Sequence, residues 1–547
     1  MVKNSSSLKW VFRVSKKSLL YVALLALLSL FMSFVSVRFA LVSKDVIDIA
    51  TGASQGRLVD AVAFLVFYIF LQILIHIIYT VTEVSVSCKL TNNIQKSVFY
   101  EACKRDYLSL GSYHTGELVN RITADSKIVS DGVMYLIPTS VLLASQVVFS
   151  FYELVKLDAQ LAVICLLAFP LVTVAVRFYG IRMKPLNKAC MSSDGKVKSF
   201  IQDVFQNILV VKAFLKEDLC TNRFSQIQKE NFSLKFKRGL ISIFANLLFF
   251  AVMSFAYYFA LIWCAHKISI GIMTVGMLTA ILQLVGVLQE PFKKFSAVIA
   301  GYYSMTASAE RLTEIENLIP DASCSENTNQ NISSLCFNNL SFAYENDMIF
   351  SEMSACISRG DMVAITGASG IGKSTLLKLM LGVLRPSSGS MKVNFEDGSC
   401  GDLPLRNLFS YVPQGNMLFA GTILDNIAFF EEKPDLNKAI QSAGCACIHE
   451  FIETLDDGYN TVLGEDGSGL SEGQIQRIAI ARAIYSDKHI MLLDEATSAL
   501  DSCIEAEILS NIKALTDKTC FIITHRPCAL ELSDREIHFN DNGVVIK

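Results

Sequence analysis

The sequence predicts an α-helical membrane domain of six transmembrane helices followed by an α/β domain with a mainly parallel sheet. Hydrophobic residues make up 52% of the 547 residues, and the mean hydropathy is +0.42, well above that of a soluble chain. This excess lies in roughly the first 300 residues, which hold six long uncharged runs. From Leu335 onward, short apolar strands alternate with helical segments, which indicates an α/β fold.

The first 18 residues carry several basic side chains and no acidic one, and Leu8, Val11 and Phe12 lie on the helical face away from Lys9 and Arg13. This pattern predicts an interfacial helix on the cytoplasmic side of the membrane. The apolar run that follows is too long for a signal peptide and lacks a clear small-residue cleavage site. We therefore expect the N-terminus to stay in the cytoplasm.

Each of the six uncharged runs has about the length that a hydrocarbon core requires. They are Leu19–Val37, Ala61–Thr82, Gly132–Tyr152, Ala159–Val176, Gly239–Ala265 and Ile268–Gln289. The connections after the second and fourth runs are long and rich in Lys and Arg, which places them in the cytoplasm by the positive-inside rule. We expect a multi-pass protein of the bacterial plasma membrane with both termini cytoplasmic.

The long connections, 83–131 and 182–238, mix charged and apolar residues at helical spacing, so the spans should continue as helices into the cytosol. Polar residues inside the spans, such as His76 and Gln289, are candidates for a wet cavity or for interhelical hydrogen bonds. The fifteen cysteines are scattered between loops, apolar runs and the C-terminal half, as is typical of reduced cytosolic thiols. The net charge of -3 and the lack of an aromatic stacking pattern argue against a nucleic-acid partner.

A polar stretch that contains Pro320 marks a domain boundary. The predicted organisation is a transmembrane domain at 1–315, a linker at 316–334 and a nucleotide-binding domain at 335–547. The last assignment rests on residues 367–374, which fit the phosphate-loop pattern G-x-x-x-x-G-K-[ST] and stand between a predicted strand and a predicted helix.

The phosphate loop predicts a P-loop nucleotide-binding domain that takes a nucleoside triphosphate with Mg²⁺. Its glycines let successive backbone NH groups point at phosphate oxygens, while Lys373 supplies a positive charge for the β- and γ-phosphates and Ser374 holds Mg²⁺. The candidate ligands in this stretch are Gly367, Ala368, Ser369, Gly370, Ile371, Gly372, Lys373, Ser374 and Thr375.

Two segments of the long loops resemble the ATP-binding cassette exporters. Thr115–Leu118 with Arg121 and Asp125 is similar to the family's first cytoplasmic loop, and Gln206–Ile208 with Val211–Phe214 is similar to its second. The resemblance implies that the tips of these loops are coupling helices that transmit motion to the nucleotide domain. Two helical hairpins with no coupling role are the alternative.

The nucleotide half resembles the same family in order along the chain. Tyr344 stands where the family places an aromatic ring on adenine, although an ordinary strand-end tyrosine is the alternative. Residues 411–414 resemble the glutamine loop, which implies that Gln414 reaches Mg²⁺ or the attacking water. Residues 470–474 resemble the signature L-S-G-G-Q, in which Ser471, Gly473 and Gln474 face a γ-phosphate.

The signature departs from the family at Glu472, which replaces the first glycine of the pair. An inward carboxylate would repel nucleotide, whereas an outward one would favour the first turn of the helix. We expect the outward orientation and a working site.

An apolar strand ends in Asp494 and Glu495, similar to the Walker B pattern. The resemblance assigns Asp494 to Mg²⁺ and Glu495 to the water that attacks the γ-phosphate. Ser498–Asp501 matches the D-loop, which places Asp501 against the other subunit, and His525 matches the histidine that contacts the γ-phosphate. Glu495, His525 and Gln414 are thus the expected catalytic residues, and Ser374, Gln414 and Asp494 the expected metal ligands.

The chain is therefore identified as similar to an exporter-type half-transporter, an ATP hydrolase coupled to transport. Because each motif occurs once and the family binds nucleotide between two subunits, the resemblance implies a second half-transporter subunit in a homodimer or heterodimer. The expected function is ATP-driven export of a small amphipathic molecule, lipid or peptide by alternating access. A heterodimer with one weak ATP site, or an ATP-binding regulatory membrane subunit with little turnover, are the alternatives, and the transported substrate cannot be read from the sequence.

Overall fold

The computed structural model describes residues 2–321, 331–344, 347–402, 406–415, 418–464, 467, 469–540 and 543–547. Side chains at 2–6, 165–178, 184, 245, 249, 292–293 and 295–296 are outside this description. Part of the predicted linker, 322–330, and Glu465, Asp466 and Ser468 ahead of the signature also lie outside it. The chain forms two compact units, Met1–Phe99 with Gly116–Glu314, and Tyr100–Thr115 with Ile315–Lys547.

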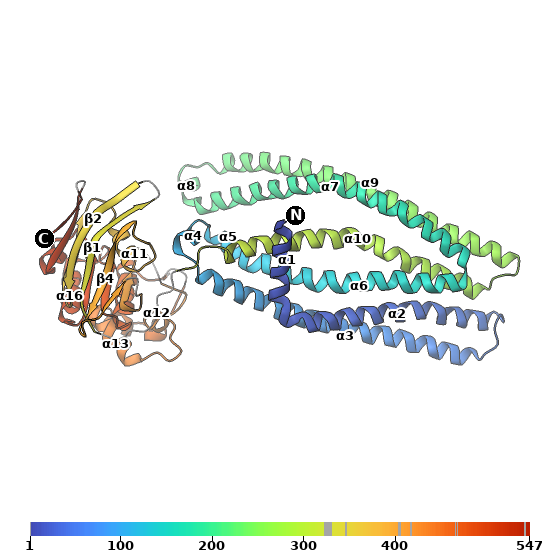
Figure 1. The fold of residues 1–547 in the computed structure, drawn as a ribbon, viewed down its shortest axis with the longest axis horizontal. Coiled ribbons are helices and arrows are strands. Elements are labelled where there is room, and N and C mark those ends of the chain that lie inside the picture. Colours follow the sequence, from blue (N-terminus) through green and yellow to red (C-terminus); the bar gives the residue numbers. More distant parts are fainter. Residues whose placement is uncertain are drawn as a thin grey trace. The chain divides into compact units, whose positions relative to one another are not determined.

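The first unit is built from helices, most of them long, as its continuous apolar and amphipathic runs predict (Figure 1). They are α1 (Val2–Ser15), α2 (Leu19–Ala50), α3 (Leu58–Cys103), α5 (Thr115–Asn120), α6 (Ser126–Leu157), α7 (Ala159–Gln206), α8 (Ile208–Ala213), α9 (Glu217–Ser269) and α10 (Val275–Glu316). Helix α2 packs along α6, and α7 packs along α9. The short 3₁₀-helix Lys16–Ser18 joins α1 to α2, and a π-helical turn at Arg121–Asp125 joins α5 to α6.

Among the described residues, four helices are long and apolar enough to cross a membrane, namely Ser7–Ala50, Leu58–Cys103, Thr115–Leu157 and Glu217–Ser269. They contain the first, second, third and fifth predicted spans. The fourth predicted span lies in α7, where the side chains of 165–178 are outside the description. The sixth lies in α10, whose apolar stretch Val275–Pro291 is shorter. The helical membrane fold is thus confirmed, and the count of six spans stays a prediction.

The boundary between the last two predicted spans was placed too early. Helix α9 continues to Ser269, and α10 begins only at Val275, so the run predicted to start at Ile268 includes the end of one helix and a turn. Gly271 takes φ +74°, a backbone conformation that glycine adopts without strain. Gln289 of α10 donates from Nε2 to the carbonyl of Met253 in α9 at 3.0 Å, which is the interhelical bond that the sequence left as one alternative.

The second unit contains the predicted α/β fold. Its central sheet has the order β12-β11-β3-β10-β9-β6, and neighbouring strands are parallel except β11 and β12. The strands are β3 (Met362–Gly367), β6 (Phe409–Val412), β9 (Ile490–Asp494), β10 (Thr519–Ile523), β11 (Arg535–Asn540) and β12 (Gly543–Ile546). A separate antiparallel sheet has the order β2-β1-β4-β5, from β1 (Ile332–Tyr344), β2 (Asp347–Ser358), β4 (Ser388–Phe395) and β5 (Cys400–Asp402).

Helices cover both faces of the central sheet, as its continuous apolar strands require. Along β10, Phe521 and Ile523 pack toward α11 and the antiparallel sheet, whereas Cys520 and Ile522 face the opposite core. The remaining elements are α4 (Tyr107–Gly111), α11 (Lys373–Met380), α12 (Ile423–Ile427), α13 (Leu436–Cys445), α14 (His449–Glu453), α15 (Glu472–Tyr485), α16 (Ser502–Ala514), α17 (Pro527–Leu532), the 3₁₀-helices Arg406–Leu408 and Gly458–Asn460, and the hairpin β7 (Gly421–Thr422) with β8 (Val462–Leu463).

The cysteine prediction was wrong at one pair. Cys336 of β1 and Cys356 of β2 form a disulfide, because the register of the two strands places them directly opposite each other. Sequence separation gives no hint of this pairing, since the two residues are 20 positions apart and the register follows from the hairpin.

Candidate nucleotide site

The predicted phosphate loop joins the carboxyl end of β3 to the start of α11. Gly372 takes φ +115° and is the residue before the helix, so the NH groups of Lys373, Ser374 and Thr375 begin α11 without carbonyl partners from a preceding turn. A Cβ atom on Gly372 would lie 2.2 Å from the side chain of Ile349. Both this close contact and the positive φ favour glycine at this position. Such a helix start suits an anion.

The other loop residues hold this geometry. Gly367 takes φ +135°, and a Cβ there would lie 2.5 Å from the carbonyl oxygen of Phe539. Ala368, Ser369 and Gly370 are exposed, whereas Ile371 packs against the core and Thr375 is buried in α11. The loop therefore presents its backbone to solvent while its ends are anchored in the domain.

Lys373 lies under this loop with only 6% of its surface exposed. Its Nζ donates to the carbonyls of Gly367 at 2.6 Å and Ala368 at 3.0 Å and lies 3.1 Å from Nε2 of His525. Burial lowers the pKa of Lys373, and the nearby carboxylates of Glu495 and Asp494 oppose that shift. The structure thus brings the predicted lysine and histidine into direct contact.

Asp494 ends β9 beside the first turn of α11. Its Oδ1 accepts from the hydroxyl of Ser374 at 2.9 Å, and its Oδ2 accepts from the hydroxyl of Tyr411 at 3.2 Å. Burial raises the pKa of Asp494, and it also raises that of Tyr411. A hydroxyl and a carboxylate at one point are hard oxygen ligands, so Ser374 and Asp494 fit Mg²⁺, which takes few protein ligands and completes its shell with phosphate and water.

Glu495 follows Asp494 and turns away from the strand with φ +51°, a conformation that is uncommon outside glycine and concentrated at functional sites. Its Oε2 accepts from Nε2 of Gln414 at 2.7 Å. The two predicted residues come from different loops, yet each orients the other. This turn is what separates the two adjacent carboxylates.

These side chains meet because β3, β6, β9 and β10 are parallel, so the loops after their carboxyl ends lie at one edge of the sheet. Gln414 follows β6, Glu495 follows β9 and His525 follows β10. The edge brings together a cation, two carboxylates, an amide and an imidazole around the phosphate loop. This set can hold a triphosphate and activate a water molecule.

Tyr344 ends β1, with 37% of its surface exposed. Its ring packs edge-to-face on Phe342, with ring centroids 4.8 Å apart. The ring thus packs against an apolar neighbour and keeps an accessible surface, which is compatible with stacking on a base.

The signature residues form the start of α15. Ser471 caps this helix, accepting from the NH of Gln474 at 3.3 Å, and the Gln474 side chain accepts from the NH of Ser471 at 2.8 Å. Glu472 is the first helical residue and is exposed. A Cβ on Gly473 would lie 3.1 Å from the carbonyl oxygen of Ala499, which explains why a glycine stands there.

Asp501 caps α16, accepting from the NH groups of Cys503 and Ile504. Gln476, which the sequence did not single out, links the D-loop to α15. Its Nε2 donates to the Ser498 hydroxyl at 3.0 Å, and its Oε1 accepts from the NH of Ala499 at 3.0 Å. The Tyr411 hydroxyl and Arg526, which donates to the carbonyls of Ser498 and Leu500, were also missed. All three act through contacts between separate elements, which no local pattern marks.

Comparison with known proteins agrees with this site. The sequence matches the ABC transporter transmembrane region over residues 20–292 and the ABC transporter nucleotide domain over residues 350–498. It is 30% identical over 446 residues to the ATP-dependent lipid A-core flippase of Syntrophus aciditrophicus, covering 80% of this chain and 74% of that protein. The chain belongs to the ABC transporter family.

A second relative, the ATP-dependent lipid A-core flippase of Desulfotalea psychrophila, is 29% identical over 446 residues, 80% of this chain and 78% of that protein. The fold is that of a solved bacterial Atm1-family ABC exporter with ATP bound, with a TM-score of 0.81, 24% identity, and coverage of 97% of this chain and 95% of that one. The predicted family, the multi-pass membrane fold, ATP binding and the coupling of ATP hydrolysis to export are thereby confirmed for this ABC transporter.

The two segments predicted to couple the domains are short helices in this transporter. In the first, Arg121 is buried and donates to Glu117, to Glu314 and to the carbonyl of Arg311. In the second, α8 leaves apolar side chains exposed, among them Leu209 at 79%. A small helix with a solvent-facing apolar surface fits a docking element.

Proposed function

We propose that this ABC transporter is a dimer in which each ATP lies between the phosphate loop of one subunit and Ser471 and Gly473 of the other. One observation carries the proposal. The start of α15 is exposed at Ser471 and Glu472, and the Ser471 and Gln474 side chains form the capping box of the helix. A capped, exposed helix start supports anion binding from outside the chain.

Hydrolysis follows from the groups at the sheet edge. Lys373 and the NH groups of α11 hold the phosphates, and Mg²⁺, held by Ser374, Asp494 and Gln414, would neutralise their charge. Glu495 orients the attacking water and accepts its proton, while Gln414 keeps the carboxylate in place at 2.7 Å. His525, in contact with Lys373, reaches the γ-phosphate. Tyr344 stacks on adenine, and Asp501 lies at the subunit interface.

Closure of the nucleotide dimer would move the membrane helices through the exposed helix α8 and the charged loop around Arg121, giving alternating access. The cargo is a small amphipathic molecule, lipid or peptide. The names of the two bacterial flippases support a lipid and a bacterial plasma membrane. Both termini lie in the cytoplasm, on the side that supplies ATP.

The decisive experiment combines two inactive subunits. Lys373→Ala removes the phosphate ligand, and Ser471→Arg blocks the signature. Each variant alone has no intact site, but a mixed dimer has one, formed by the wild-type phosphate loop of one subunit and the wild-type signature of the other. We expect co-expression to restore ATPase activity in lipid. Absence of recovery, with both subunits co-purifying, would show that the site is completed within one chain.

A heterodimer with one weak site, or a regulatory subunit with little turnover, is favoured only by Glu472, since Glu495, Gln414 and His525 are intact. The mass of the detergent-solubilised complex after expression alone separates a homodimer from a subunit that needs another chain. Uptake of labelled lipid or peptide into inside-out vesicles tests export, and import by right-side-out vesicles would contradict it.

A further inference from the structure

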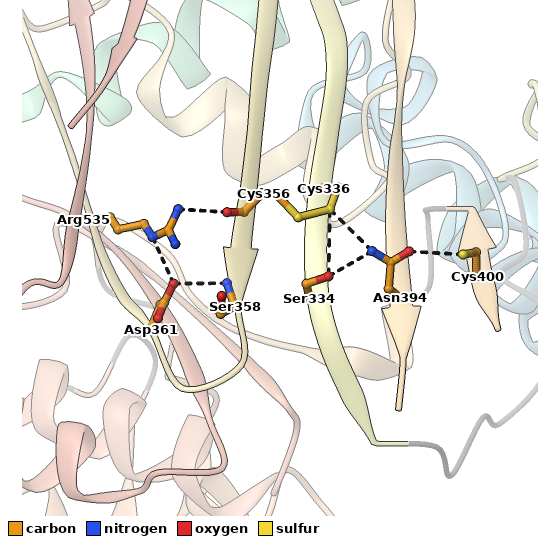
Figure 2. The surroundings of a disulfide bond; sticks show 8 residues. All are labelled: Ser334, Cys336, Cys356, Ser358, Asp361, Asn394, Cys400 and Arg535. Atoms are coloured by element: carbon orange, nitrogen blue, oxygen red, sulfur yellow. Dashed lines mark hydrogen bonds and ion pairs between the residues drawn. A yellow bond between two sulfur atoms is a disulfide. The ribbon is translucent and has the colours of Figure 1, made fainter. Parts of the chain in front are cut away.

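The disulfide Cys336–Cys356 joins neighbouring strands β1 and β2 of the antiparallel sheet (Figure 2). Leu335 and Phe337, on either side of Cys336, and Ile357, next to Cys356, are buried in the core. Because side chains alternate along a strand, both cysteines point away from that core, and Cys356 is exposed. This disulfide is therefore accessible to small solutes, unlike a bond buried between two sheets.

A third thiol lies in the neighbouring row of the sheet, because Asn394 of β4 pairs with Ser334 of β1 and with Cys400 of β5. Asn394 of β4 donates from Nδ2 to Sγ of Cys336 at 3.5 Å and to the hydroxyl of Ser334 at 2.9 Å. Its Oδ1 accepts from Sγ of Cys400 on β5 at 3.1 Å (Figure 2). The four residues Cys356, Cys336, Asn394 and Cys400 come from β2, β1, β4 and β5, which are neighbours in that order in the sheet. The asparagine separates Cys400 from the bonded pair.

The backbone around the pair is fixed by contacts other than the disulfide. Strands β1 and β2 are hydrogen-bonded with Cys336 opposite Cys356, whose Cα atoms are 4.1 Å apart. Arg535 donates to the carbonyl of Cys356 at 2.9 Å and forms an ion pair with Asp361 at 3.2 Å. Asp361 also accepts from the NH of Ser358 at 3.0 Å. Breaking the S–S bond would therefore leave the two thiols facing each other, ready to reform it.

We propose that Cys336 and Cys356 are a reversible dithiol–disulfide site that exchanges with low-molecular-weight disulfides of the cytosol. A nucleotide domain on the ATP side of the membrane meets a thiol-rich compartment, where protein disulfides are usually transient or redox-sensing. An accessible cross-strand pair with no need for backbone movement suits this exchange.

The exchange balances in two steps. The thiolate of the exposed Cys356 attacks one sulfur of the small disulfide, forming a mixed disulfide and releasing one small thiolate. The thiolate of Cys336 then attacks the Cys356 sulfur, forming the cross-strand bond and releasing the second. Two electrons pass from the cysteine pair to the small disulfide, and the two cysteine protons end on the released thiols. An excess of small thiol drives both steps backward.

The bond has a consequence for ATP, which rests on the proposed role of Tyr344. The closed loop Cys336–Cys356 contains Tyr344, and β1 shifts register against β2 at several points between Phe337 and Ala343. Cross-linking the base of this irregular hairpin restricts the strand that presents the ring. The oxidised form should hold Tyr344 more firmly, and its KM for ATP should be a few-fold lower than that of the reduced form.

The site is tested on the full-length protein in lipid, equilibrated with mixtures of reduced and oxidised glutathione, quenched with acid, alkylated and mapped by peptide mass. Cys336 and Cys356 should pass together from alkylated to bonded as the oxidised fraction rises, and return when it falls. Cys400→Ser should leave this transition unchanged. Cys336→Ser, or Cys336→Ala if the first variant is unstable, should trap glutathione on Cys356.

Three results would overturn the site: a pair that stays reduced in oxidised glutathione, a pair that stays bonded in excess reduced glutathione, or a bond from Cys336 to Cys400. The KM for ATP is then measured for the oxidised form, the reduced form and the double variant Cys336→Ser/Cys356→Ser. The KM of the double variant should not change with the redox buffer. Equal KM values for the two forms would refute the link to Tyr344. Loss of ATPase activity in every form would instead refute the proposed function, while the mapped exchange would stand.

Discussion

The two halves of the proposed nucleotide site are built differently. At the phosphate-loop half, Lys373 contacts His525, Ser374 contacts Asp494, and Gln414 contacts Glu495, so side chains from several loops hold one another in place. At the signature half, the side chains of Ser471 and Gln474 each accept from the other's backbone NH, and Asp501 caps its own helix. The phosphate-loop half is thus held by side-chain contacts between loops of the same chain, whereas the signature half has the hydrogen bonds of a capped helix start.

From this difference we propose that the phosphate-loop half carries catalysis and that the signature half carries the specificity of assembly. In the proposed dimer, preorganised charges at the phosphate loop would activate the water, while the exposed helix start would contribute backbone NH groups and need little side-chain chemistry. Substitutions in the first half should therefore change the rate of hydrolysis, and those in the second should change how the halves meet.

Glu495→Gln should lower the ATPase rate at least about a hundredfold, because the amide cannot accept the proton of the attacking water. ATP binding should persist, since Lys373 and the start of α11 are untouched. The rate and the binding of a fluorescent ATP analogue are measured on the same preparation. The exposed Glu450→Gln serves as control and should behave as the wild type. Equal rates for Glu495→Gln and wild type would remove the general-base role.

Gln476→Ala should lower the ATPase rate about tenfold, with little change in nucleotide affinity, because it frees Ser498 and Ala499 of the D-loop from α15. Gln441→Ala, at an exposed position on α13, is the matched control. Kinetics in lipid give KM and kcat separately. A change confined to KM would mean that Gln476 supports nucleotide binding and not the alignment of the two halves.

Asp494→Asn should stabilise the nucleotide-free protein at neutral pH by about 1 kcal/mol while abolishing Mg²⁺-dependent turnover. Burial raises the pKa of Asp494 in the folded state. The protonated side chain therefore contributes to the free energy of unfolding at low pH, and this contribution is lost as the pH rises through the folded-state pKa. The neutral amide of asparagine avoids the cost of burying a charged carboxylate. Apparent melting temperatures without nucleotide should thus differ most near pH 7 and converge toward about pH 4, the usual range of Asp. A constant difference across pH would point to packing.

The geometry of the phosphate-loop half is more predictable from the sequence than that of the other regions, for physical reasons. Strand, glycine loop and helix follow one another at Asp361–Met380, so local order fixes the geometry, and parallel strands carry Glu495 and His525 to the same edge. The Gln476 and Tyr411 contacts depend on how separate elements pack. The Cys336–Cys356 bond depends on hairpin register, and the end of α9 on a turn at Gly271, neither of which composition specifies.

The smallest effect is expected at the signature, where Glu472→Gly should change the KM for ATP by less than about threefold. The carboxylate is the first residue of α15 and is exposed, a position where a negative charge interacts favourably with the helix N-terminus by about 0.3–1 kcal/mol. Glycine gives up that interaction and loosens the first turn, so a slight loss of thermal stability should accompany the substitution. Glu472→Gln separates charge from shape. A large gain in ATP affinity in both variants would show that the carboxylate faces the nucleotide and repels it, and the signature half would then set the affinity of the site through charge as the phosphate-loop half does.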